Sequence, residues 1–162
     1  MKHIEWTGVY PAVTTKFKAN GDLDIPAFLK NIEFQVEAGI DGIVIGGSLG
    51  ESSTITHKER LELAQAALDA VGNKIHVLLN IAEGSTRTAI NLVQQAEAIG
   101  IHGIMLLPPM MYKPTEQEVA DFFIEVAQST ALPIMLYNNP VDYKIEITFP
   151  IFEQLTPFKN IQ

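Results

Sequence analysis

The sequence predicts an α/β protein in which a strand and a helix alternate five times. Apolar runs rich in β-branched residues recur about every 30 residues, as expected of βαβ units. Amphipathic stretches with helical spacing separate these runs. One joint between a helix end and a strand also occurs twice, as residues 38–43 and 99–104. This pattern fits part of a (β/α)8 TIM barrel with about five βα units, or a five-stranded doubly wound sheet.

The choice between the two folds rests on length and on regularity. The chain has 162 residues, which favours the doubly wound sheet, because a barrel usually takes about 250 residues. Against this, all five crossovers look alike and no switch interrupts the series. Polar residues also lie where non-adjacent strands end, which is where barrel enzymes place their chemistry.

The first strand is predicted at residues 9–14, and the Asn20-Gly21 pair after it marks a turn. Pro26 suits the first turn of the next helix, where its missing N–H costs nothing. Gly39 is predicted to end that helix.

The second strand is predicted at residues 43–45. After it, Thr56 and Glu59 form a capping box, in which each side chain satisfies an orphan backbone N–H of a starting helix. Gly72 is predicted to stop this helix, and the third strand follows at residues 75–80.

Ser85 is predicted to cap a helix that ends at Gly100, directly before a fourth strand at residues 103–107. Two prolines come next and cannot continue a strand ladder, so residues 110–114 are predicted to be a loop.

A second capping box, Thr115 to Glu118, begins the following helix. The fifth strand is predicted at residues 132–137 and a short helix at 147–155. Residues 158–162 resemble the approach to a sixth strand.

Composition limits the classes of partner. The net charge is −8 and basic residues are scattered, which argues against nucleic acid or an anionic membrane and favours a small-molecule ligand. The chain has no cysteine, as is typical of a cytoplasmic protein. Residues 1–6 lack the apolar core of a signal peptide, and no apolar run is long enough to span a bilayer. The spacing of His3, His57, His76 and His102 suggests no metal site, so we interpret them as structural or exposed.

Two polar clusters that follow apolar runs predict one pocket. Residues 46–50 form a glycine-rich turn that carries Ser48, but they lack the lysine of a P-loop and the spacing of a dinucleotide site. Tyr137 and Asn138 lie where another apolar run ends. The ends of parallel strands meet at one edge of a sheet, so we expect these clusters to lie together.

Three segments then resemble a known family. Residues 47–52, Gly-Ser-Leu-Gly-Glu-Ser, are similar to the G-[TS]-T-G-E-[ST] motif of the dihydrodipicolinate synthase and N-acetylneuraminate lyase family. Residues 136–140 are similar to its Y-N-x-P motif, and residues 108–112 to its [TP]-P-Y-Y loop. The resemblance extends from residue 8 to residue 162 in the same order and spacing.

The resemblance implies a (β/α)8 lyase in which a lysine forms a Schiff base with pyruvate or a related 2-keto acid. Tyr137 would be the proton shuttle and Ser48 would help to relay the proton. The N–H groups of Ser48, Leu49 and Gly50 would bind the keto-acid carboxylate, helped by the start of the following helix. No metal or organic cofactor is expected, and the full-length protein would be a homo-oligomer, either a tetramer or a dimer.

Three positions depart from the family pattern. Leu49 replaces a second threonine, so a hydroxyl contact to the carboxylate is lost. Met111 replaces a tyrosine that extends the relay across a subunit interface, and the neighbouring Tyr112 is a candidate relay or interface residue. Asp142 replaces an arginine that grips the second substrate's carboxylate. These changes favour an aldolase, a sialic-acid-type lyase, or a 2-keto acid dehydratase or deaminase over dihydrodipicolinate synthase itself.

The family's Schiff-base lysine has no match in this chain. The family spacing places it roughly three residues beyond Gln162, at the C-terminal end of a barrel strand. Lys159 precedes that strand and is predicted to face solvent. We therefore expect residues 1–162 to be the N-terminal portion of one TIM-barrel domain, inactive alone. The alternative is a non-catalytic small-molecule-binding or scaffolding α/β module.

Overall fold

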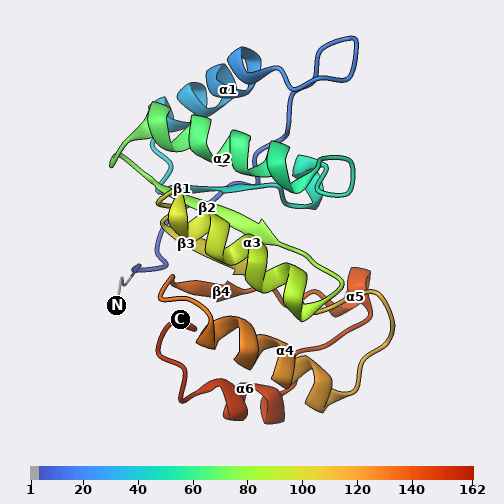
Figure 1. The fold of residues 1–162 in the computed structure, drawn as a ribbon. Coiled ribbons are helices and arrows are strands. Elements are labelled where there is room, and N and C mark those ends of the chain that lie inside the picture. The colour runs from blue at the N-terminus through green and yellow to red at the C-terminus, as the bar shows by residue number, and fades with distance from the viewer. Residues whose placement is uncertain (1–3) are drawn as a thin grey trace.

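A four-stranded parallel sheet forms the centre of the molecule. The computed structural model describes residues 4–162, and its strands are β1 (Gly42–Ile45), β2 (His76–Ile81), β3 (Gly103–Leu106) and β4 (Ile134–Leu136). They lie side by side in the order β1-β2-β3-β4, which is also their order in the chain (Figure 1). A doubly wound sheet reverses its strand order at a switch point, and this sheet has no reversal.

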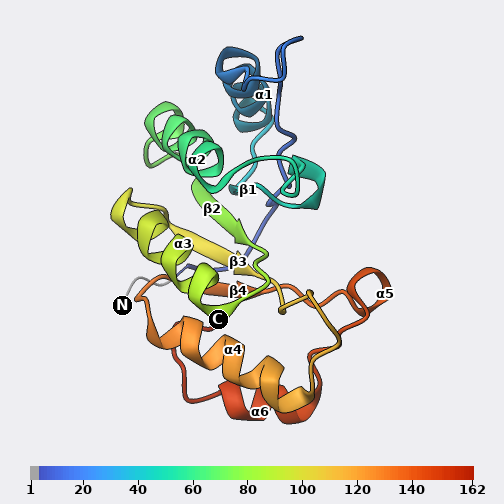
Figure 2. The ribbon, with the colours of Figure 1, turned by 45° about the vertical axis from the view of Figure 1, so that its right-hand side comes forward.

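The helices follow the same sequential order. They are α1 (Ile25–Glu37), α2 (His57–Val71), α3 (Thr86–Ala98), α4 (Glu116–Gln128) and α6 (Phe149–Leu155). Each packs against the next, from α1 on α2 to α4 on α6, and together they cover one face of the curved sheet (Figure 2). A doubly wound fold would place helices on both faces. The structure is therefore a partial (β/α)8 barrel, and the doubly wound alternative is wrong.

The predicted first strand and the approach to a sixth strand each pair with the sheet through one residue. Residues 9–14 form no regular strand, and Ala12 makes a single parallel bridge with Val44. Pro11 has no N–H to donate, which limits the ladder on that side. At the opposite edge Ile161 makes a single parallel bridge with Ile134. The predicted approach to a sixth strand is therefore confirmed.

The helix starts agree with the capping signals. Thr56 with Glu59, and Thr115 with Glu118, form complete capping boxes, and the Ser85 side chain caps α3. The last helix begins two residues later than predicted. A short helix, α5 (Pro140–Tyr143), was not predicted at all. None of the helices within residues 4–162 combines the length and hydropathy needed to cross a bilayer.

The repeated joint has the same geometry at both places. Gly39 and Gly100 both have φ of +86°, a left-handed conformation that glycine adopts readily after a helix. Two residues later, Asp41 and His102 each accept a backbone N–H of the neighbouring strand or strand segment, at 2.7 and 2.9 Å. The sequence repeat thus corresponds to a structural repeat.

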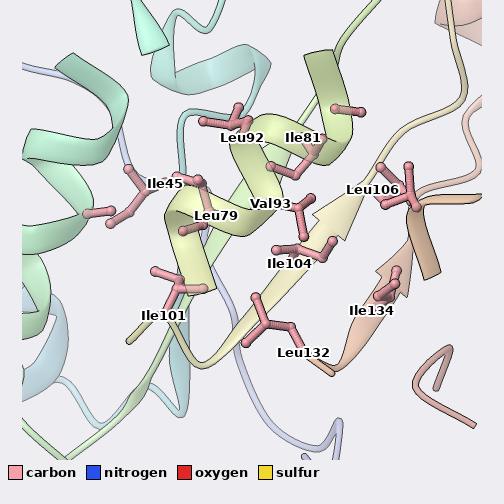
Figure 3. Packing of buried hydrophobic residues seen from close by; sticks show 14 of the residues in the cluster. Ile45, Leu79, Ile81, Leu92, Val93, Ile101, Ile104, Leu106, Leu132 and Ile134 are labelled. Carbon is pink, nitrogen blue, oxygen red and sulfur yellow. The ribbon is translucent and has the colours of Figure 1, made fainter. Parts of the chain in front are cut away.

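The main core lies between the sheet and the helices. Alternate strand residues such as Ile45, Leu79 and Ile104 are almost fully buried against Leu92 and Val93 of α3 (Figure 3). Burying one such side chain contributes about 1.5–3 kcal/mol. The residues between them, which include Val44, Leu78, Met105 and Met135, project from the opposite, concave face because strand side chains alternate.

Candidate active site

The glycine-rich turn after β1 is a short 3₁₀ helix, η1 (Ser48–Gly50). The N–H of Gly50 donates to the Gly47 carbonyl, at 2.9 Å, so the turn itself uses that donor. The N–H groups of Ser48 and Leu49 begin the turn. Helix α2 starts only at His57, with its first turn already capped by Thr56 and Glu59. The N-terminus of α2 therefore does not adjoin the Ser48 turn, and the prediction that it helps this turn to bind a carboxylate is wrong.

Residues 13–15 of the N-terminal segment pack against this turn. The Thr15 hydroxyl donates to the Gly50 carbonyl at 2.6 Å, and Thr15 is buried. A Cβ atom on Gly50 would lie 2.8 Å from the carbonyl oxygen of Val13. Gly50 is thus required for the close approach of two backbone segments.

A buried arginine supports the turn from the helix side. Arg60 of α2 is only 3% exposed and lies so close to Gly46 that a Cβ there would be 2.9 Å from its side chain. Its guanidinium donates to the Glu83 carboxylate at 3.0 Å and to the Ser52 carbonyl at 3.1 Å. Buried charges in proteins are normally paired in this way. The arginine thereby ties the loop after β1 to the loop after β2.

Asn80 of β2 extends this support on the concave face. It is 1% exposed, and its side-chain N–H donates to the Gly46 carbonyl at 3.0 Å. Asn80 pairs in register with Met105, which pairs with Met135. Tyr137 follows Met135 by two residues and so lies on the same face, anchored by its N–H to the Leu106 carbonyl at 3.0 Å.

Helix α5 brings an additional tyrosine to the Ser48 turn. Asn139 caps α5, and Tyr143 is its last residue. The Tyr143 hydroxyl lies 2.5 Å from the Ser48 hydroxyl. The rings of Tyr143 and Tyr137 meet edge to face, 6.0 Å apart between centroids, and the Asn139 amide donates to the Tyr137 hydroxyl at 3.3 Å. Ser48 and Tyr137 are therefore linked through Tyr143.

Backbone strain occurs at the same edge. Among residues 4–162, Glu51 and Lys144 are the non-glycine residues with positive φ, at 57° and 59°. They directly follow η1 and α5, the elements that carry Ser48 and Tyr143. Such conformations are unfavourable for side-chain-bearing residues and cluster at functional sites.

Tyr112 does not join this group. It is 56% exposed, and its hydroxyl donates to Glu118 at 3.3 Å. The negative charge of Glu118 raises the pKa of the Tyr112 phenol, which favours its protonated form. Within the described residues no hydrogen bond connects Tyr112 with Ser48 or Tyr137. The neighbouring Met111 is 77% exposed.

Two further sequence-based candidates lie at this edge. Leu49 is 71% exposed, so its side chain points to solvent and does not cover the N–H groups of the turn. Asp142 is exposed, and its carboxylate accepts the Asn139 amide at 2.7 Å. A negative charge therefore lies next to Tyr143 in the chain. Lys159 is exposed, as predicted.

The described histidines have structural contacts, and the rings of His76 and His102 meet edge to face. His57 lies 3.0 Å from Glu83, and His76 shares a hydrogen bond with Tyr10 at 2.9 Å. The His102 ring accepts the N–H of Val77. His3 lies outside the described residues. In the part of the chain that the structure describes, no three potential ligand side chains converge as a metal site.

Sequence reasoning missed Tyr143, Asn80, Arg60 and Glu83. A signal for Tyr143 does exist, because Asn139-Pro140 is a typical start of a helix and places Tyr143 at its end. Arg60 lies in a strongly helical stretch, and nothing in the sequence indicates that its charge is buried. Asn80 ends an apolar run, which is the same signal that selected Tyr137.

The Ser48 turn, Tyr143 and the Arg60–Glu83 ion pair lie at the carboxyl ends of the strands. In Figure 1 the loop after β1, the loop after β2 and α5 are on the side to which the strand arrows point, while the described ends of the chain lie on the other side. Barrel enzymes build their active sites at this edge.

Comparison with known proteins identifies relatives of this chain. A model of the dihydrodipicolinate synthetase family matches residues 5–162. A 4-hydroxy-tetrahydrodipicolinate synthase from Moorella thermoacetica is 36% identical over 159 residues, covering 98% of this chain and 54% of that protein. An uncharacterized DapA-like lyase from Rhizobium meliloti is 34% identical, covering 97% of this chain and 54% of that protein. The chain spans about half the length of the curated relatives it matches.

Solved structures show the same likeness in three dimensions. Dihydrodipicolinate synthase DapA-2 from Bacillus anthracis superposes with a TM-score of 0.94 at 30% identity, covering 98% of this chain and 55% of that one. YagE from E. coli K12, described as a prophage protein of the dihydrodipicolinic acid synthase family in complex with pyruvate, superposes with a TM-score of 0.91 at 34% identity. That match covers 96% of this chain and 53% of YagE. By sequence and by structure, this chain belongs to the dihydrodipicolinate synthetase family.

Proposed function

We propose that the protein containing this chain is a Schiff-base-forming lyase that acts on pyruvate or a related 2-keto acid, by aldol cleavage or condensation. The observation that carries the proposal is the pairing of the Ser48 turn with Tyr137 and Tyr143 at the carboxyl edge of a partial barrel of this family. The relative YagE was solved in complex with pyruvate, which supports the substrate class.

The chemistry assigns a role to each group. A lysine amine condenses with the ketone and releases water, and the resulting iminium accepts electrons from an adjacent carbon as that carbon loses a proton. We propose Tyr137 as the group that moves this proton and Ser48 as its relay. The N–H groups of Ser48 and Leu49 would donate to the substrate carboxylate, since N–H bonds to a charged acceptor are among the stronger hydrogen bonds. The N–H of Gly50, expected as a third donor to the carboxylate, already bonds to the Gly47 carbonyl, so we propose that Gly50 shapes this turn.

The identity of the second reactant is a separate part of the proposal. Asp142 places a negative charge within α5, which disfavours a second carboxylate there. This supports an aldolase, dehydratase or deaminase reaction on a 2-keto acid with a neutral or hydroxylated tail. Product analysis with such acids, by mass spectrometry, distinguishes release of an aldehyde from release of water or ammonia.

Borohydride trapping tests the central step. The natural gene product is incubated with pyruvate and sodium borohydride, and its intact mass is measured. We expect one reduced pyruvate adduct per chain, and peptide mapping should place it on a lysine outside residues 1–162. An adduct on Lys144 or Lys113 would overturn the proposed position of the lysine. The absence of any adduct would overturn the lyase proposal and favour the binding or scaffolding module.

We also propose that the full-length protein is a cytoplasmic homo-oligomer. Leu49, Met111 and Tyr112 are large apolar side chains exposed at one edge, as is typical of a protein interface. Sedimentation of the natural gene product should show a dimer or a tetramer, and Met111→Lys should shift it toward the monomer. A monomeric wild-type protein would contradict this part.

A further inference from the structure

The hydrogen bond between Ser48 and Tyr143 joins two elements that are distant in the chain. The two hydroxyl oxygens are 2.5 Å apart and their residues are 95 positions apart in sequence. Tyr143 is partly buried and its ring packs edge to face against Tyr137. One side chain therefore contacts both residues that the proposed mechanism uses.

Two other polar side chains at this edge, Tyr112 and Asn139, are bonded to groups other than Ser48. The Tyr112 hydroxyl is directed to Glu118, and the Asn139 amide donates to the Tyr137 hydroxyl and to Asp142. Among the described residues, Tyr143 is the side chain whose hydroxyl reaches Ser48. A serine hydroxyl carries one proton and accepts through two lone pairs, so the bond that it accepts determines where its own proton points.

We propose that Tyr143 is a positioning residue of this active site. In this arrangement its hydroxyl donates to Ser48 and leaves the Ser48 proton directed toward substrate and Tyr137. A proton that Tyr137 takes from the substrate leaves to solvent through Ser48 and Tyr143, and a solvent proton returns by the same path, so the chain ends with the charge it began with. The relay would thus be completed within one chain. This inference rests on the proposed lyase function.

Exchange of the pyruvate methyl protons in D₂O tests this role without a second substrate. Formation of the enamine removes a methyl proton and its reversal adds a deuteron, and proton NMR follows the loss of the methyl signal. In the natural gene product, Tyr143→Phe keeps the ring against Tyr137 but removes the hydroxyl. We expect exchange to slow about tenfold to a hundredfold, the range for losing a hydrogen bond to a proton-transfer group. The pyruvate concentration that gives half-maximal borohydride trapping should change less than about threefold, because the N–H donors remain.

Two matched variants separate positioning from packing. Tyr10→Phe removes a tyrosine hydroxyl that is hydrogen-bonded to His76 at the opposite edge, and should exchange at the wild-type rate. The double variant Ser48→Ala/Tyr143→Phe should exchange no more slowly than Ser48→Ala alone, because the two hydroxyls act as one unit. Additive losses would mean that Tyr143 does not act through Ser48 and would overturn the inference.

The outcomes also separate this inference from the proposed function. A wild-type protein with neither adduct nor exchange refutes the lyase and, with it, the role of Tyr143. A wild type that exchanges, with a folded Tyr143→Phe at the same rate, refutes the role of Tyr143 alone. If Tyr143→Phe does not fold, 3-fluorotyrosine at position 143 replaces it, since it keeps the shape and makes the phenol more acidic. A shifted pH profile for exchange then supports the role, and an unchanged profile overturns it.

Discussion

The two edges of the sheet differ in how their polar groups are used. At the amino ends of the strands, Tyr10 packs against Trp6 and bonds to His76, whose ring lies edge to face with His102. Burial raises the pKa of the Tyr10 phenol, with the charge of Asp41 as a second cause. At the carboxyl ends, hydroxyl groups lie on short strained turns backed by a buried ion pair. The first edge closes the sheet with aromatic packing, and the second presents the hydroxyl groups that we propose to act in proton transfer.

The difference shows what each edge requires of its backbone. At the amino edge, an added Cβ on Gly42 would lie 2.3 Å from the Tyr10 ring, and the nearest backbone atom, the His76 carbonyl oxygen, would be 3.0 Å away. At the carboxyl edge, Gly50 admits another backbone carbonyl, which has no rotatable bond of its own. A side chain can move away from a new atom, whereas a hydrogen-bonded backbone cannot. Substitutions of Gly42 and of Gly50 should therefore affect the protein differently.

The largest expected effect comes from the Tyr137 hydroxyl. Tyr137→Phe should lower pyruvate proton exchange and turnover about 10²–10⁴-fold, the usual contribution of a positioned acid-base group. NMR exchange and steady-state kinetics measure both. A loss below about fivefold would show that Tyr137 is not the proton shuttle and would remove the chemical distinction between the edges.

Next in size is the ion pair behind the Ser48 turn. Glu83→Ala leaves Arg60 buried without its carboxylate, which should cost about 3–5 kcal/mol in the free energy of unfolding. Urea denaturation followed by circular dichroism gives the value. The matched control is His57→Ala, which removes a partner whose side chain is 43% exposed and should cost less than about 1 kcal/mol. Equal losses in the two variants would contradict the role given to Arg60.

Alanine at the two glycines compares the edges directly. Gly50→Ala should destabilise the protein by about 1–3 kcal/mol and also weaken pyruvate binding, because the Ser48 turn must move away from Val13. Gly42→Ala should affect stability alone, since Tyr10 is remote from Ser48. Denaturation and borohydride trapping, measured as a function of pyruvate concentration, test the pair. Weaker pyruvate binding in Gly42→Ala would show that the edges are coupled.

The smallest effect concerns acid sensitivity at the carboxyl edge, where α2 and α4 begin. Hydrogen bonds from the Thr56 and Thr115 backbone N–H groups lower the pKa of Glu59 and Glu118 below the usual 4.5. A lowered folded-state pKa adds stability above pH 4.5, and that stability is lost as the pH falls through the folded-state pKa. Between pH 6 and pH 3 the urea midpoint should therefore fall less in Glu59→Gln than in wild type. Parallel pH curves would exclude this contribution.

Much of the fold was predictable because its signals are local. Thr56 and Glu59 are three residues apart and form their capping box in any helix that starts there. The first strand was only partly predictable: residues 9–14 have the composition of a strand, but Pro11 and a position at the sheet edge reduce it to one bridge.

The candidate site was predictable only where it depends on strand ends. Ser48 and Tyr137 follow apolar runs, and parallel strands bring such ends together. The contact between Ser48 and Tyr143 depends on the exact turn of a four-residue helix, which no periodicity reveals. Arg60 was not predictable as a buried charge, because its partner Glu83 lies in another loop.

The connections from α1 to β1 and from α3 to β3 are two copies of one helix-to-strand turn. Both use a left-handed glycine and a side-chain acceptor that bonds to a backbone N–H of the preceding strand or extended segment. The acceptors differ in kind: Asp41 accepts through a carboxylate oxygen, and His102 accepts through a ring nitrogen. A barrel can therefore gain further βα units by repeating one helix-to-strand turn. The acceptor side chain of each copy can then differ according to the residues around it.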